Sequence, residues 1–150
     1  MNILTPVSHL MSTELITVNA KDTLTRVKEI FDTDNIHHLP VVDFKKIIGL
    51  ISKTDLLYFL KGAKNLSEAE EQENAVSLSF HTAKDIMVTK LAKLTPSDTV
   101  GTAIAVFQEN LFHALPVVDE EELVGILTTY DLLNFFSQER VQLSDYQIQA

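Results

Sequence analysis

The sequence HHLPVVD at His37–Asp43 is repeated as HALPVVD at His113–Asp119, 76 residues later (113 − 37 = 76). The same offset carries Met11–Leu60 onto Met87–Phe136 without a gap. Self-similarity at a fixed offset is typical of repeated structural units, each of which buries its apolar surface against a neighbour. We therefore predict a tandem duplication whose two copies pack on each other.

The periodicity of apolar residues changes in the same order in both copies. Each begins with a short apolar segment, at Leu15–Val18 and Leu91–Leu94, and continues with apolar residues at helical spacing. Two apolar strands then form a hairpin, joined in the first copy by Asp43–Lys46, and a final helix follows Ser52. Each copy is predicted to be a β-α-β-β-α unit, a three-stranded sheet with both helices on one face. Because the other face would be bare, we predict an α+β fold in which the two units pack as a pseudo-symmetric pair through their sheets.

The predicted boundaries are repeat 1 at 1–62, an acidic linker at 63–80, repeat 2 at 81–140 and a C-terminal tail at 141–150. The linker contains the run Ser67–Asn74, whose composition is typical of a solvated helix or a mobile loop. Thr5-Pro6 is predicted to open a short turn or helix, and Ser77–Met87 to repeat that lead-in for the second copy.

Composition excludes several classes of function. The chain has 150 residues, is 45% hydrophobic and contains no cysteine, which removes disulfides, thiol catalysis and iron–sulfur chemistry. Its net charge of −9 repels nucleic acids and anionic lipid surfaces. Its longest apolar stretches are far shorter than the roughly 20 residues that span a bilayer, and its first residues do not resemble a secretory signal. We expect a cytoplasmic protein with no nucleic-acid partner and no membrane insertion.

The chemistry-bearing residues stand where the last strand of each copy meets the last helix. A hydroxyl residue lies three positions before an aspartate in both copies, as Ser52 and Asp55 and as Thr128 and Asp131. This spacing is typical of a helix capping box. It also suits a nucleotide, because free N–H groups and a hydroxyl attract phosphate while the aspartate accepts hydrogen bonds from ribose. The two interpretations are compatible.

The whole pattern resembles the CBS domain family, and in particular the tandem pair called a Bateman module. The residues that carry the resemblance are Met11-Ser12-Thr13 and Met87-Val88-Thr89, the Asp-Thr helix starts, the His-x-Leu-Pro-Val-Val-Asp strands and the Gly-x-φ-Ser/Thr-x-x-Asp ends. The resemblance implies a regulatory, energy-sensing module rather than an enzyme. It implies binding of AMP, ADP, ATP or S-adenosylmethionine in two related clefts, with no other cofactor and no metal, and signalling to a separate protein target.

The resemblance also assigns roles to individual residues. Asp55 and Asp131 would bind ribose, and Ser52 and Thr128 would bind phosphate or line the neighbouring cleft. The adenine base would lie against the first strand of a copy, with a histidine close to the ligand. The ligand-binding residues implied in this way are Leu15, Ile16, His37, Pro40, Ser52, Lys53, Asp55, Leu91, Ala92, His113, Pro116, Thr128 and Asp131.

The two copies differ in charge near these motifs. Lys53 stands in the first motif where the second has Thr129, and Lys45-Lys46 in the first hairpin corresponds to acidic residues in Glu120–Glu122. We therefore expect phosphate to be better tolerated near the first motif.

Three alternative functions fit the sequence to different degrees. A metal site built from the chain's histidines lacks the close helical spacing that such sites commonly use; these residues are His9, His37, His38, His81 and His113. A hydrolase lacks a nucleophile elbow or a phosphate-loop motif. A ligand-free dimerisation or scaffold module stays open, because capping alone satisfies the motifs.

Self-association is expected under both leading interpretations. The final helices carry more apolar surface than one sheet face can cover, which predicts a homodimer. The apolar residues concerned are Leu56, Leu57, Phe59, Leu60, Leu132, Leu133, Phe135 and Phe136.

Overall fold

Two antiparallel hairpins form the centre of the computed structural model, which describes residues 2–60, 66–110 and 112–137. In the first hairpin β2 (His38–Asp43) pairs with β3 (Lys46–Ser52), and in the second β4 (Ala114–Asp119) pairs with β5 (Glu122–Thr128). The predicted tail at 141–150 and the first linker residues, 63–65, lie outside the described residues.

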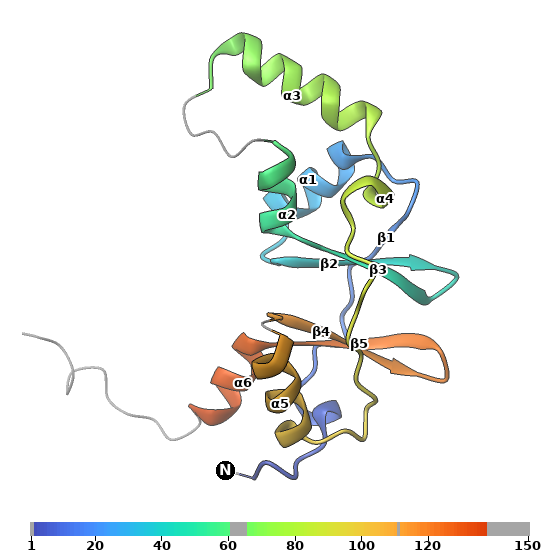
Figure 1. The fold of residues 1–150 in the computed structure, drawn as a ribbon, viewed down its shortest axis with the longest axis vertical. Helices are drawn as coiled ribbons and strands as arrows, with labels where there is room; N and C mark the ends of the chain where they lie inside the picture. The colour runs from blue at the N-terminus through green and yellow to red at the C-terminus, as the bar shows by residue number, and fades with distance from the viewer. Residues whose placement is uncertain (1, 61–65, 111, 138–150) are drawn as a thin grey trace, which may run out of the picture.

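Helices flank the two hairpins in the same order. The helix before each hairpin is α1 (Leu24–Thr33) or α5 (Val100–Asn110), and the helix after it is α2 (Lys53–Phe59) or α6 (Thr129–Phe136). Figure 1 shows the two sheets facing each other across the middle, with α1 and α2 outside one sheet and α5 and α6 outside the other. The predicted α+β fold of two repeated units packed through their sheets is confirmed.

The first strand of each copy is shorter than predicted. Strand β1 is only Val18–Asn19, parallel to β2, and in the second copy a single parallel bridge joins Leu94 to Val117, so that its sheet has two strands rather than three. Proline explains where the pairing stops. To continue toward Leu15 or Leu91, a parallel ladder needs the N–H of the residue at Pro40 or Pro116, and proline has none.

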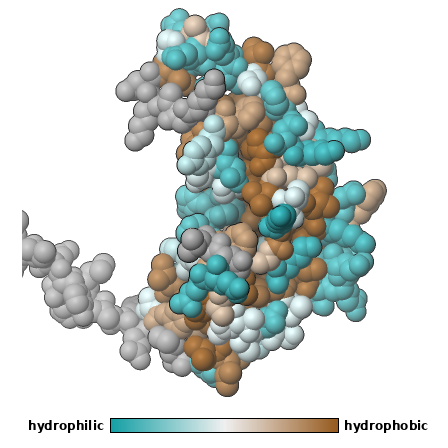
Figure 2. Space-filling view, in the orientation of Figure 1, coloured by the Kyte–Doolittle hydropathy of each residue, from teal (hydrophilic) through white to brown (hydrophobic). Residues whose placement is uncertain are grey.

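Two further helices lie between α2 and α5. Helix α3 (Glu68–Phe80) begins with a capping box between Ser67 and Glu70 and packs against α1, and α4 (Ala83–Ile86) follows it. Of the two states proposed for the acidic run, the helix is therefore the one found. In Figure 2 hydrophilic residues gather at the top of the molecule, where α3 lies. The short 3-10 helix η1 (Val7–His9) follows Pro6, as predicted from the proline.

The segment that leads into each copy, residues 5–12 or 81–88, packs into the opposite half; we call it the lead-in segment. Val7 is fully buried in the apolar core of the second half, and Ala83, 76 residues later, is fully buried in the core of the first. Backbone hydrogen bonds extend this exchange, since Ser12 pairs with Ile126 in β5 and Val88 pairs with Leu50 in β3. A boundary drawn along the sequence therefore does not separate the two packed halves.

The tips of the two hairpins also hold the halves together. The Lys45 carbonyl accepts a hydrogen bond of 2.9 Å from the Leu123 N–H, and Lys46 Nζ lies 2.8 Å from Glu121 Oε2. The hydrogen bond between the two side chains, and then the attraction of their charges, lowers the pKa of Glu121 and raises that of Lys46. Both side chains are exposed, so the pair contributes more to alignment than to stability.

Candidate functional site

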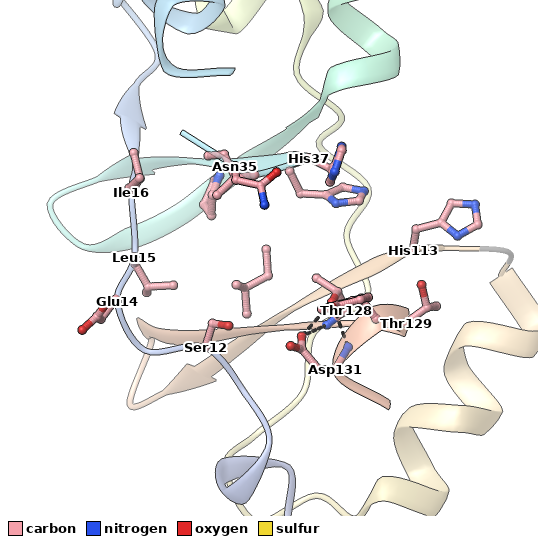
Figure 3. A pocket seen from close by; sticks show the side chains of 15 residues that line it. Ser12, Glu14, Leu15, Ile16, Asn35, His37, His113, Thr128, Thr129 and Asp131 are labelled. Carbon is pink, nitrogen blue, oxygen red and sulfur yellow. Dashed lines mark hydrogen bonds between the residues drawn. The ribbon is translucent and has the colours of Figure 1, made fainter. Parts of the chain in front are cut away.

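A cleft of about 690 Å³ lies between the two halves (Figure 3). Its walls come from the segment after Ser12, the approach to β2 and the junction of β5 with α6. Its volume lies within the range of roughly 300–1,000 Å³ that is typical of small-molecule sites. The residues that line it are Ser12, Glu14, Leu15, Ile16, Asn35, Ile36, His37, His38, Pro40, His113, Ile126, Thr128, Thr129, Tyr130 and Asp131.

The aspartate of the second motif caps its helix with only one of its two oxygens. Asp131 Oδ2 accepts hydrogen bonds of 2.7 Å from both the N–H and the hydroxyl of Thr128, and Thr128 Oγ1 accepts one from the Asp131 N–H. Asp131 Oδ1 has no hydrogen-bond partner among the described residues. The predicted capping box is thus present, and an acceptor remains free beside the cleft. Ser52 and Asp55 form the equivalent box in the first half.

The opposite wall adds a free backbone acceptor to the side chains that line it. Because Pro40 cannot donate, the carbonyl of Ile16 is left without the ladder partner it would otherwise have, and the described residues supply no other. Ile16 is 36% exposed and lines the cleft together with Leu15. A flat, partly aromatic ligand lying on these apolar side chains could donate a hydrogen bond to that carbonyl.

Three histidines line the same cleft. Burial lowers the pKa of His38, and the neighbouring imidazoles of His113 and His37 lower it further, against a smaller raising effect of the Asp55 carboxylate. His38 is therefore neutral at neutral pH. His37 and His113 are exposed, and their carbonyls accept the N–H groups of Lys53 and Thr129, which start the last helices.

The structure shows how the predicted site residues group. The cleft brings together Leu15, Ile16, His37, Pro40, His113, Thr128 and Asp131. The other predicted residues lie outside its lining and occupy the positions related by the 76-residue offset: Ser52, Lys53, Asp55, Leu91, Ala92 and Pro116. The first strand of one copy thus shares a cleft with the motif of the other, a pairing that the sequence interpretation left unassigned. That these residues bind a ligand stays a prediction.

Several lining residues were not predicted: Ser12, Glu14, Asn35, Ile36, His38, Ile126, Thr129 and Tyr130. Some had a signal, since Thr129 and Tyr130 lie inside the second motif and Glu14 directly precedes Leu15. Asn35 and Ile36 follow α1 and have no recognisable pattern, because only the packing of the halves brings them to the cleft.

The prediction that Lys45 and Lys46 favour phosphate near the first motif is wrong. Lys45 and Lys46 lie at the opposite end of β3 from Ser52, roughly 20 Å away for a strand of this length, and Lys46 is paired with Glu121. They are too distant to bind a ligand phosphate at Ser52. Lys53 remains the basic residue of that motif.

The described ranges hold neither a metal cluster nor a membrane-spanning helix. No group of three or more histidine or acidic side chains there is arranged to hold a metal ion. No described helix is both long enough and apolar enough to cross a membrane.

Comparison with known proteins identifies close similarities. The sequence profile of the CBS domain matches twice, at residues 7–62 and 83–138. The chain is 27% identical over 135 residues to an uncharacterized protein of Methanocaldococcus jannaschii, MJ1404, covering 89% of this chain and 32% of that protein. It spans between 21% and 42% of the length of the first curated relatives that it matches.

Three solved structures are similar at 25% identity. The CBS domain of a CBS domain-containing membrane protein from Sphaerobacter thermophilus has a TM-score of 0.77, with 88% of each chain covered. CBSX2 in complex with AMP has a TM-score of 0.72, with 89% of this chain and 96% of that chain covered. The CBS domain pair of protein MJ0100, in complex with 5′-methylthioadenosine and S-adenosyl-L-methionine, has a TM-score of 0.72, with 88% and 99% covered.

Proposed function

Since this chain belongs to the CBS domain family, we propose that it is a regulatory module that binds an adenosine-containing ligand in the cleft between its halves. CBS-pair proteins are generally regulatory rather than catalytic, and a regulatory role needs no catalytic residue in this chain. We further propose that the protein is soluble and cytoplasmic. It would sense the level of a nucleotide or of S-adenosylmethionine and signal to a separate protein target.

The observation that carries the proposal is the pairing of two free acceptors from different halves. Asp131 Oδ1 belongs to the second half and suits the two hydroxyls of a ribose, while the Ile16 carbonyl belongs to the first and suits an exocyclic amino group. Adenosine carries both of these donor groups, with an apolar ring between them that Leu15 and Ile16 can cover. CBSX2 with AMP and MJ0100 with 5′-methylthioadenosine support this ligand class.

Binding of this kind would act on the relative placement of the halves. A ligand that contacts Ile16 on one wall and Asp131 on the other stabilises the arrangement in which both contacts are made. It therefore shifts the population of inter-repeat arrangements by its differential affinity for them. The outer helices α2 and α6, which follow directly from the two motifs, would carry that change to a partner.

A thermal-shift panel tests the proposal. The purified protein is heated with AMP, ADP, ATP, S-adenosylmethionine or 5′-methylthioadenosine, with the corresponding guanosine nucleotides as controls. A ligand at 100 times its Kd stabilises the folded state by roughly 2.7 kcal/mol, which is several degrees for a chain of this size. A shift with at least one adenosine compound and none with guanosine compounds is expected. If no adenosine compound shifts the midpoint, the ligand-free scaffold function replaces this one.

A further inference from the structure

The 76-residue offset relates the cleft to a counterpart of different charge. We define the first cleft by Glu14, Leu15, Ile16, Thr128, Thr129 and Asp131, and the counterpart site by Lys90, Leu91, Ala92, Ser52, Lys53 and Asp55. The aspartate is retained between them. Glu14 is replaced by Lys90 (90 − 14 = 76), and Thr129 by Lys53 (129 − 53 = 76). The substitution of an acid by a lysine and of a threonine by a lysine makes a difference of three unit charges.

Backbone contacts place the two sets of residues equivalently. Ser12 exchanges hydrogen bonds of 2.9 and 3.0 Å with Ile126 of β5, and Val88 exchanges bonds of 3.0 and 2.9 Å with Leu50 of β3. Two residues beyond these bridges stand Glu14 and Lys90 respectively. Lys90 is therefore located relative to β3 and the Asp55 box as Glu14 is relative to β5 and the Asp131 box.

Backbone hydrogen bonds also place Lys53 as the equivalent of Thr129. The Lys53 N–H donates to the His37 carbonyl at 2.8 Å, as the Thr129 N–H donates to the His113 carbonyl at 3.1 Å. Lys53 is the residue directly after Ser52 and two before Asp55, so its backbone holds in the counterpart site the position that Thr129 holds in the first cleft. This hydrogen bond to the residue before β2 anchors the Lys53 backbone and does not use its side chain.

The first cleft has no compensating cation among its described lining residues. It contains Glu14, which Figure 3 shows at the rim, and Asp131, together with three histidines of which His38 is neutral. A phosphate dianion brought into this cleft is repelled by both carboxylates. A neutral nucleoside is not repelled, and a sulfonium cation such as that of S-adenosylmethionine is attracted.

We infer that the two sites divide adenosine ligands by charge: the first cleft takes a neutral or cationic adenosine compound, and the counterpart site, with Lys53 and Lys90, takes a phosphorylated one. This inference rests on the proposed function, because it assumes that both sites bind adenosine. The module could then respond to two classes of metabolite, because one site binds neutral or cationic adenosine compounds and the other binds phosphorylated ones. Equal affinity of both sites for one ligand is not expected.

Exchanging the charged residues between the sites tests the inference. The variant with Lys53→Thr and Lys90→Glu gives the counterpart site the residues of the first cleft, and the variant with Glu14→Lys and Thr129→Lys does the reverse. Affinities for AMP and for 5′-methylthioadenosine are measured by calorimetry at low and high salt, with the thermal midpoint of each variant confirming that it folds. Because hydrogen bonds to charged groups are lost, the first variant is expected to bind AMP at least about tenfold more weakly.

The second variant is expected to gain AMP affinity at the first cleft, and added salt is expected to reduce AMP affinity in the wild type. Lys53→Arg, which keeps the charge, should retain AMP binding and serves as the conservative control. An unchanged ratio of AMP to 5′-methylthioadenosine affinity in both exchange variants overturns the division by charge while leaving the proposed function in place. If the wild type binds none of AMP, ADP, ATP, 5′-methylthioadenosine and S-adenosylmethionine, the proposed function itself is overturned.

Discussion

The side chain of Met87 occupies the space in which Gly49 has no side chain. A Cβ built on Gly49 would lie 2.9 Å from Met87 Cβ, closer than unstrained atoms approach, and would overlap the thioether. Met11 covers Gly125 in the same way: its own Cβ would lie 3.3 Å from a Cβ built on Gly125, which would overlap the Met11 thioether. Met87 belongs to the lead-in segment of the second copy, and Gly49 belongs to β3 of the first. This contact therefore depends directly on the packing of a lead-in segment into the opposite half.

Replacing Gly49 or Gly125 with alanine tests whether the lead-in segments pack against the opposite half. Gly49→Ala is expected to lower the free energy of unfolding by about 1–3 kcal/mol, because the new methyl group overpacks a filled space. Gly125→Ala should cost less, since the Met11 Cβ lies farther away and the overlap there falls on the flexible end of the Met11 side chain. Urea unfolding followed by circular dichroism measures both, and Met87→Ala should recover part of the loss in the Gly49→Ala background.

Gly101 provides the matched control. It lies in α5, where an added Cβ would make only ordinary contacts, the nearest at 3.4 Å from the Ile3 carbonyl oxygen. Gly101→Ala should be neutral or stabilising by up to about 1 kcal/mol, through higher helix propensity. If Gly49→Ala behaves like Gly101→Ala, the lead-in segments do not pack as described.

Protonation of His38 is expected to destabilise the fold. Its pKa is lowered from 6.5 by burial and by His113 and His37, against Asp55, so the unfolded chain binds the proton more tightly. Stability should therefore fall as the pH drops below 6.5 and should be retained above it. In urea unfolding between about pH 7.5 and about pH 5.5, His38→Ala should show a weaker loss than the wild type.

Alanine is a suitable replacement because Ala114 stands at the equivalent position of β4. His9→Ala, at an exposed histidine, controls for the removal of an imidazole elsewhere. Identical pH dependence in the wild type and His38→Ala would show that His38 titrates as it does in the unfolded chain.

The hairpin turns are strained by their sequence. Phe44 and Lys45 adopt φ of 45° and 68°, the left-handed values of a type I′ turn, which asparagine and glycine prefer. Phe44→Asn with Lys45→Gly should raise the free energy of unfolding by about 1 kcal/mol, while Phe44→Ala alone should give no gain. A fall in the urea midpoint of the double variant would contradict the turn geometry.

Dimerisation through the outer helices is a further prediction. Leu57 on α2 and Leu133 on α6, related by the offset, are 50% and 67% exposed. Sedimentation analysis should find the wild type as a dimer, and Leu57→Glu with Leu133→Glu as a folded monomer. Val76→Glu, at an exposed apolar residue on α3, should remain dimeric. A monomeric wild type would exclude the homodimer.

The sequence was sufficient to predict the repeated unit, because each copy supports the assignment of the other. The shared offset predicted both hairpins and both capping boxes, which depend on residues close together along the chain. The sequence predicted first strands that are too long. Pro40 and Pro116 shorten them by withholding an N–H from the neighbouring strand, and this effect depends on strand pairing rather than on residues close together along the chain.

Only some of the residues that line the cleft could be predicted, because the others depend on how the two halves pack. The motifs identified Leu15, Ile16, Thr128 and Asp131, but not that the first strand of one copy meets the motif of the other. That pairing depends on how the two sheets face each other and on the lead-in segments that cross between halves. Asn35 and Ile36 enter the cleft by the same packing and leave no local pattern.

The most direct test of ligand binding in the first cleft is calorimetric titration of 5′-methylthioadenosine into the wild type, Asp131→Ala and Asp55→Ala. Both variants lose an equivalent capping box, so their losses of stability should be similar, and only Asp131 lines the first cleft. We predict binding by the wild type, retained binding at the first cleft in Asp55→Ala, and at least about tenfold weaker binding in Asp131→Ala. No binding by the wild type, or equal affinity in all three proteins, would contradict the account.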